Sequence, residues 1–179
     1  MIVLDISGSM YENYAGSTRL NFARGLLAQR IRDLRDGTPF AIVVYGESAL
    51  RSGPLVPANA ETRRAGIAYL YQEYDCGGGT NLPVGLALGE ELHAGSIVLA
   101  TDGDLNMSAS ELLPQVHDIL SRDGQAPAFT VFAVGPRPDT DAEKLLHELA
   151  DQEGGTYQCL QGGSMTAALT PAPANVATP

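Results

Sequence analysis

The sequence predicts an α/β fold, namely a doubly wound, mostly parallel open sheet with helices on both faces. Short apolar runs alternate along the chain with longer segments of helical periodicity, which is typical of βαβ units. The runs are continuous and rich in β-branched residues, as in strands that are buried on both faces of a parallel sheet. The length of 179 residues, of which 44% are hydrophobic, suits one compact domain.

Four apolar runs are the predicted strands of the sheet. Two of them end at acidic residues, because residues 2–4 lead into Asp5 and residues 97–100 lead into Thr101-Asp102-Gly103. The other two, residues 40–45 and 129–134, are stopped by glycine. Weaker signals predict a short edge strand within the loop of residues 50–60 and a final edge strand at residues 156–160.

Apolar residues that recur at spacings of three and four predict the helices between these strands. The stripes cover residues 20–34, 67–74, 112–120 and 142–149, and residues 83–93 form a shorter candidate. Pro114 requires the third of these helices to start late, near Ser110. Thr140 and Glu143 form a capping-box pattern before the fourth. We expect one domain over residues 1–160, followed at 161–179 by a short helix or turn and a flexible Ala/Pro/Thr-rich tail.

The charge balance limits the function classes. The chain has 11 Lys and Arg against 21 Asp and Glu, a net charge of −10, and a pI near 4.6. This field disfavours nucleic acids and anionic membranes as partners. The apolar runs are far shorter than the roughly 20 residues of a membrane span, and the start of the chain lacks the features of a signal peptide. We therefore expect a cytoplasmic protein, or an extracytoplasmic one if the chain is a fragment.

The chemistry-bearing residues follow the strands. Asp5-x-Ser7-x-Ser9 comes after the first, Asp102 comes after the third, and Thr80 lies in the glycine-rich loop of residues 76–81. Ligands of open α/β sheets bind beyond the carboxyl ends of the strands. Carboxylate and hydroxyl oxygens suit a hard cation, Mg²⁺ or Mn²⁺, whereas Ca²⁺ would want more oxygen ligands. Cys76 and Cys159 are too few for a zinc cluster or a disulfide scaffold, and we expect two reduced thiols.

Together these five positions resemble the metal-ion-dependent adhesion site (MIDAS) of von Willebrand factor type A (VWA) domains. The resemblance extends from the first strand to about residue 160 and implies a Rossmann-like sheet with Mg²⁺ at its top. It implies that Asp5, Ser7 and Ser9 hold the metal from the first loop, with Thr80 and Asp102 on the second and third. It also implies capture of a partner's Glu or Asp carboxylate. By analogy, related domains work inside cells with ring-type ATPases, or bind extracellular ligands.

Other interpretations compete with a metal-dependent binding module. Taken alone, Ser9, Ser17 or Thr18 would cap the following helix. The chain could instead be a Mg²⁺-dependent phosphohydrolase with Asp5 as nucleophile. Ser7 argues against this enzyme, since a general-acid Asp is expected at that position, and no lysine lies near either loop. A scaffold domain with a vacant site is the third interpretation. We favour a non-enzymatic binding module.

Overall fold

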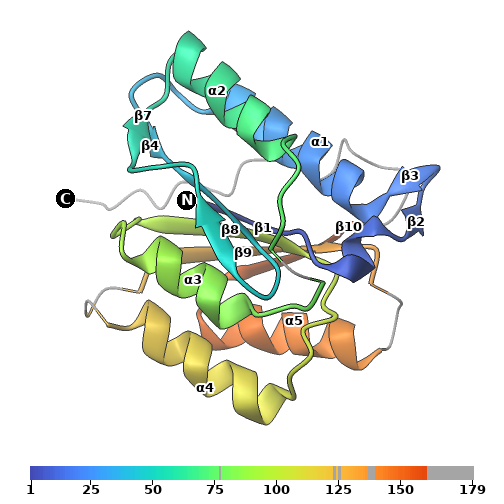
Figure 1. Cartoon of the computed structure of the whole chain (residues 1–179). Coiled ribbons are helices and arrows are strands. Elements are labelled where there is room, and N and C mark those ends of the chain that lie inside the picture. Colours follow the sequence, from blue (N-terminus) through green and yellow to red (C-terminus); the bar gives the residue numbers. More distant parts are fainter. Residues whose placement is uncertain (77, 123, 125, 137–139, 161–179) are drawn as a thin grey trace.

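A six-stranded open sheet lies at the centre of the computed structural model (Figure 1), which describes residues 1–76, 78–122, 124, 126–136 and 140–160. The strand order is β10-β9-β8-β1-β5-β6, and every neighbouring pair is parallel except β5 and the antiparallel edge strand β6. The predicted doubly wound, mostly parallel sheet is therefore confirmed.

The strands of this sheet are β1 (Ile2–Asp5), β5 (Ile42–Tyr45), β6 (Ala49–Arg51), β8 (Ser96–Thr101), β9 (Ala128–Val134) and β10 (Thr156–Leu160). Two small antiparallel pairs join β2 (Asn13–Tyr14) to β3 (Ser17–Thr18) and β4 (Pro39–Phe40) to β7 (Val56–Pro57). The helices are the 3-10 helix η1 (Gly8–Tyr11), α1 (Arg19–Asp33), α2 (Ala60–Leu70), α3 (Leu82–Glu90), α4 (Ala109–Leu120) and α5 (Asp141–Gln152).

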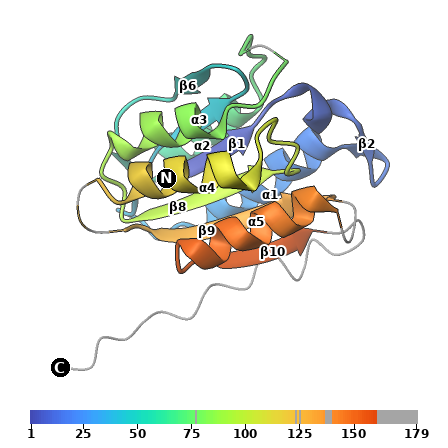
Figure 2. The ribbon, with the colours of Figure 1, turned by 90° about the horizontal axis from the view of Figure 1, so that it is seen from below.

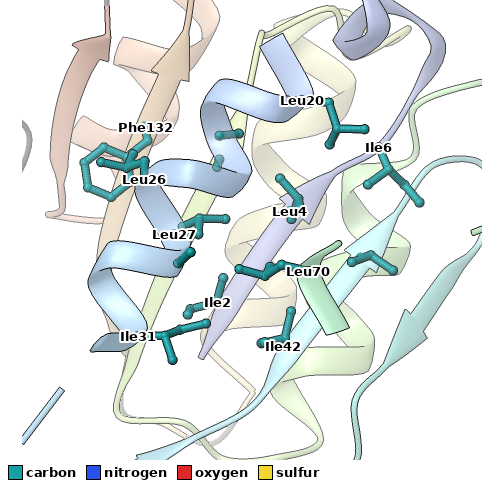
Figure 3. Close-up of a cluster of buried hydrophobic side chains, with 14 of the residues drawn as sticks. Ile2, Leu4, Ile6, Leu20, Leu26, Leu27, Ile31, Ile42, Leu70 and Phe132 are labelled. Carbon is teal, nitrogen blue, oxygen red and sulfur yellow. The ribbon is translucent and has the colours of Figure 1, made fainter. Parts of the chain in front are cut away.

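Helices cover both faces of the sheet. Helices α1 and α2 lie on one face, and α3, α4 and α5 lie on the other (Figures 1 and 2). Alternate residues of β1 serve the two sides, because Leu4 packs in the core with Leu27 of α1 whereas Val3 packs in the core with Leu86 of α3. Figure 3 shows the first of these cores, in which α1 faces β1. Burial on both faces explains why the strand sequences are continuous apolar runs.

The structure corrects several predicted boundaries. The run at residues 40–45 is divided, with β4 ending at Phe40 and β5 beginning at Ile42. Helix α2 ends at Leu70, so Tyr74 lies beyond it, and α3 ends at Glu90 rather than near residue 93. The edge strands expected within residues 50–60 and at 156–160 are present. The predicted tail at residues 161–179 lies outside the described residues.

Pro114 stands inside α4, because that helix begins at Ala109, slightly earlier than expected. Proline lacks the amide that would bond to the carbonyl of Ser110 one turn earlier. The residue lies on the exposed side of an otherwise amphipathic helix, where water can solvate that carbonyl. The helix therefore accommodates the proline without burying an unpaired polar group.

The strand order places a topological switch beside β1. From β1 the chain crosses to β5 on one side, and it later returns to β8, β9 and β10 on the other. Leu4 of β1 is in register with Ala100 of β8, so the next residues, Asp5 and Thr101, lie side by side at the ends of neighbouring strands. Such a reversal leaves a crevice at the carboxyl ends of the two strands, where open α/β sheets bind ligands.

Candidate metal centre

Asp5 is the innermost candidate ligand. It ends β1, and its side chain is completely buried. Its Oδ1 accepts a hydrogen bond of 2.8 Å from the Ser7 amide, while its Oδ2 accepts from the hydroxyls of Thr101 at 2.7 Å and Tyr45 at 3.3 Å. Burial raises the pKa of Asp5 to about 6; the hydrogen bonds from Ser7 and Thr101 oppose the rise, and the charge of Asp102 adds to it.

Ser7 lies on the loop between β1 and η1, and Ser9 lies at the start of η1. Ser7 is completely buried and Ser9 is half-buried. Their Oγ atoms are 3.3 Å apart, so both hydroxyls turn to the same side of the loop. The capping interpretation does not hold for Ser9, because the cap of α1 is Thr18, whose hydroxyl accepts from the Asn21 amide at 3.1 Å.

Asp102 comes directly after β8 and is 5% exposed. Its Oδ1 accepts a hydrogen bond of 3.1 Å from the Asp104 amide, and the Ser9 side chain also hydrogen-bonds to its carboxylate. Burial raises the pKa of Asp102, although these hydrogen bonds and the charge of Arg19 oppose the rise. The next residue, Gly103, has a φ of +86° and would bring a Cβ within 3.1 Å of a carbonyl oxygen of α5, so the sharp turn after Asp102 requires glycine.

Thr80 approaches from the loop that precedes α3. This loop is tied to the first loop by a hydrogen bond of 3.1 Å from the Gly8 amide to the Gly78 carbonyl. Thr80 is 8% exposed, and its hydroxyl forms no hydrogen bond with a described residue. The next residue, Asn81, caps α3 and fixes where the loop ends. Direct contacts thus join Asp5, Ser7, Ser9 and Asp102, whereas Thr80 lies on an adjoining loop with an uncommitted oxygen.

The donor set fits a hard cation. Two carboxylates are buried close enough for the charge of Asp102 to raise the pKa of Asp5, and the pKa of each is raised mainly by burial. Buried carboxylates that resist ionisation would be stabilised in their charged form by a dication. The remaining donors are hydroxyl oxygens, which Mg²⁺ and Mn²⁺ accept. The described part of the chain contains no group of three or more His, Cys, Asp or Glu side chains that could hold a metal ion.

Sequence reasoning missed three residues at this site. Tyr45 and Thr101 bind Asp5, and both are completely buried at the ends of the strands flanking β1. Their positions at strand ends were the available signal, but they become informative only once the strand order is known. Arg19 lies 3.6 Å from a carboxylate oxygen of Asp102, and no local pattern in the sequence indicated this contact.

Further polar residues lie near these loops and on the neighbouring helices. Asp104 contributes its amide to Asp102 but has an exposed side chain, and Asn106 occupies an exposed turn with a φ of +50°. His117 pairs with Glu153, and His147 stacks on Tyr157. Cys76 and Cys159 are both free.

Comparisons with solved structures identify the fold. A von Willebrand factor type A protein from Catenulispora acidiphila shares 22% identity at a TM-score of 0.70, over 93% of this chain and 39% of its own length. An aerotolerance-related membrane protein from Bacteroides fragilis shares 18% identity at a TM-score of 0.74, over 94% and 92% of the two chains. The SpRpn10 VWA domain shares 11% identity at a TM-score of 0.64, over 97% and 94%. The chain has the VWA fold.

At these identities the likeness concerns the fold alone. No protein-family model matches the sequence, and no curated protein matches it either. Within the described residues, none of the helices combines the length and the apolar character that crossing a bilayer requires. In this VWA fold the predicted ligand positions lie at the end of β1, on the segment that follows it through η1, after β8 and on the loop before α3.

Proposed function

We propose that this VWA domain is a protein-binding module that captures an acidic residue of a partner through a divalent cation, Mg²⁺ or Mn²⁺. Asp5, Ser7, Ser9, Thr80 and Asp102 would hold the cation. The supporting observation is the convergence of two buried carboxylates and several hydroxyl groups from three chain segments at the switch point of the sheet. Five ligand positions on the chain leave a place for a sixth from a partner.

The ligand types also suit this role. Two carboxylates hold one dication without filling its coordination shell, and the hydroxyl donors are neutral, so a bound cation would still attract an anionic ligand to its open position. That attraction matters because the chain carries a net charge of −10 and would otherwise repel an acidic partner. The ring-type ATPases implied by the resemblance are one proposed source of such a partner.

The phosphohydrolase alternative has less support. A nucleophilic carboxylate needs an oxygen that a phosphate group can reach. Asp5 is completely buried, and both of its oxygens already accept hydrogen bonds. Ser7, which stands where a general acid would be expected, is buried and donates its amide to the same carboxylate.

Calorimetric titration with Mg²⁺ and Mn²⁺ tests the metal site. Asp102→Asn should reduce binding at least tenfold, because it removes one of two charges that hold the cation. Asp33→Asn changes the net charge equally but lies on the exposed surface of α1, so it should bind like the wild type. Equal binding by the wild type and Asp102→Asn would contradict the proposed site.

Selection of displayed random peptides tests the partner chemistry. Peptides retained in Mg²⁺ and eluted by EDTA should share an Asp or Glu, and its replacement by Asn or Gln should abolish binding to the wild-type domain. The Asp102→Asn domain should retain none of them. Peptides that remain bound in EDTA, or that tolerate loss of the carboxylate, would contradict capture through the metal.

A further inference from the structure

Arg19 brings a positive charge to the edge of the proposed metal site. It is the first residue of α1, and 14% of its side chain is exposed. Its Nη1 donates to the Ser9 carbonyl at 3.0 Å and to Glu12 Oε2 at 2.7 Å, and it lies 3.6 Å from Asp102 Oδ2. Its backbone amide also donates to the Glu12 carbonyl at 3.2 Å. The guanidinium is therefore fixed in place rather than free in solvent.

The start of a helix does not by itself favour a cation at this position. The first turn of a helix carries a positive partial charge, so arginine is electrostatically unfavourable there. Its Nε is buried without a hydrogen-bond partner among the described residues, which adds a further cost. The neighbouring anions, Glu12 and Asp102, account for its placement. The side chain also lines a cavity of about 250 Å³ whose walls include Ser9, Glu12, Asp102 and Asp104.

We propose that Arg19 is a built-in counter-ion of the metal site, which lowers its affinity for divalent cations, and that Glu12 limits this effect by holding part of the guanidinium charge. The inference rests on the proposed function, because it assumes that Asp102 binds a cation. A dication bound to Asp102 would have to approach against the charge of Arg19. The site would then fill only at higher metal concentration than its oxygen ligands alone would require.

The size of the effect follows from Coulomb's law. A monovalent and a divalent cation a few ångströms apart repel one another, even in a medium close to water, enough to change binding roughly tenfold. Glu12 is mostly exposed, so its own direct attraction for the metal is screened. Its main influence on the site is expected to pass through Arg19.

Calorimetric titration of metal-free protein with Mg²⁺ at constant ionic strength tests the proposal. Arg19→Gln should bind Mg²⁺ about tenfold more tightly than the wild type, while Arg19→Lys should stay within about threefold of it because the charge is kept. Glu12→Gln should bind several-fold more weakly in the wild-type background and change little in the Arg19→Gln background. Arg32→Gln is the matched control, since it removes the same charge from the exposed far end of α1, and should stay within twofold of the wild type.

Unchanged or weaker Mg²⁺ binding by Arg19→Gln would overturn the counter-ion role while leaving the proposed metal function intact. Circular dichroism melting in EDTA checks that each variant is folded, and a weaker Arg19→Gln combined with a normal Arg19→Lys would show that the charge supports the site instead. If the wild type and all variants fail to bind Mg²⁺ or Mn²⁺, the proposed function and this inference both fail.

Discussion

Asp5→Asn should stabilise the protein when no metal is present. The carboxyl group is completely buried, and burial raises its pKa from 3.8 to about 6. The folded protein then binds a proton that the unfolded chain has released, so the free energy of unfolding falls as pH rises from about 4 to about 6. Above about pH 6 this loss of stability is complete. The two pKa values differ by about two units, and at about 1.4 kcal/mol for each unit the loss amounts to roughly 3 kcal/mol. Asparagine carries no charge and avoids this loss.

The gain should be somewhat smaller than that value. An asparagine oxygen can still accept a hydrogen bond from the Ser7 amide or the Thr101 hydroxyl, but bonds to a neutral amide are weaker than bonds to a carboxylate. We therefore expect Asp5→Asn to raise the free energy of unfolding by about 1–3 kcal/mol at pH 7.5, and by much less at pH 4.5. Urea unfolding in EDTA, followed by circular dichroism at both pH values, measures this difference.

Two controls sharpen the measurement. Asp33→Asn removes an exposed carboxylate of α1 and should change stability by less than about 0.5 kcal/mol. Mg²⁺ should stabilise the wild type, because a ligand that binds only the folded state shifts the equilibrium toward it, but it should leave Asp5→Asn unaffected. The reasoning is refuted if Asp5→Asn is less stable than the wild type at pH 7.5 in EDTA, since Asp5 would then carry no uncompensated charge.

Three further outcomes follow from the structure. Gly155→Ala should lower the free energy of unfolding by about 2–3 kcal/mol in thermal melts, because a Cβ there would lie 2.3 Å from the carbonyl oxygen of Phe129. Gly25→Ala lies within α1 and in open space, so it should raise the free energy of unfolding by about 0.5–1 kcal/mol. Equal effects of the two substitutions would contradict the packing around Gly155. Asn59→Ala should lower the free energy of unfolding in urea by about 1 kcal/mol, because two amides of the first turn of α2 lose the side-chain oxygen that caps them. A change below about 0.3 kcal/mol would argue against the cap. Thr80→Ala should weaken Mg²⁺ binding in calorimetry without changing the free energy of unfolding in EDTA, because the Thr80 hydroxyl bonds to no described residue. A lower free energy of unfolding in EDTA would assign Thr80 a structural role instead.

The strands, and the positions of Asp5 and Asp102 at their ends, were predictable from sequence because their signals are local. Residues 2–4 form a continuous apolar run that stops at a carboxylate, and the structure places Asp5 at the end of β1. The same pattern located Asp102 after β8. Doubly buried strands and their polar ends are both properties of a few consecutive residues, which is why this level of the fold was accessible.

The end of α2 was not predictable from the apolar spacing. The apolar spacing extends past Leu70, but α2 ends there because the amide of Tyr71 turns back to Ala68 and Tyr69. Tyr74 then packs on Tyr69 from outside the helix. Periodicity records which residues are apolar, and it does not distinguish a helical stripe from residues that reach the same core by a loop.

In the candidate site, too, some features were predictable from local sequence and others were not. The types of its ligands are local, but the groups that hold Asp5 come from β5 and β8, and Tyr45 meets it only because β5 adjoins β1. Arg19 reaches Asp102 because α1 packs beside β1. None of these neighbours is specified by spacing along the chain.

The bond between Asp5 and Thr101 joins residues 96 positions apart, and it closes most of the chain into a loop. An ion held between the segments of Asp5 and Asp102 would link the two ends of that loop. Its binding energy would therefore be available only after the central strands have assembled. A fragment that lacks either the first or the third segment cannot offer the ion all of these oxygens, so the ion would bind late in folding rather than initiate it.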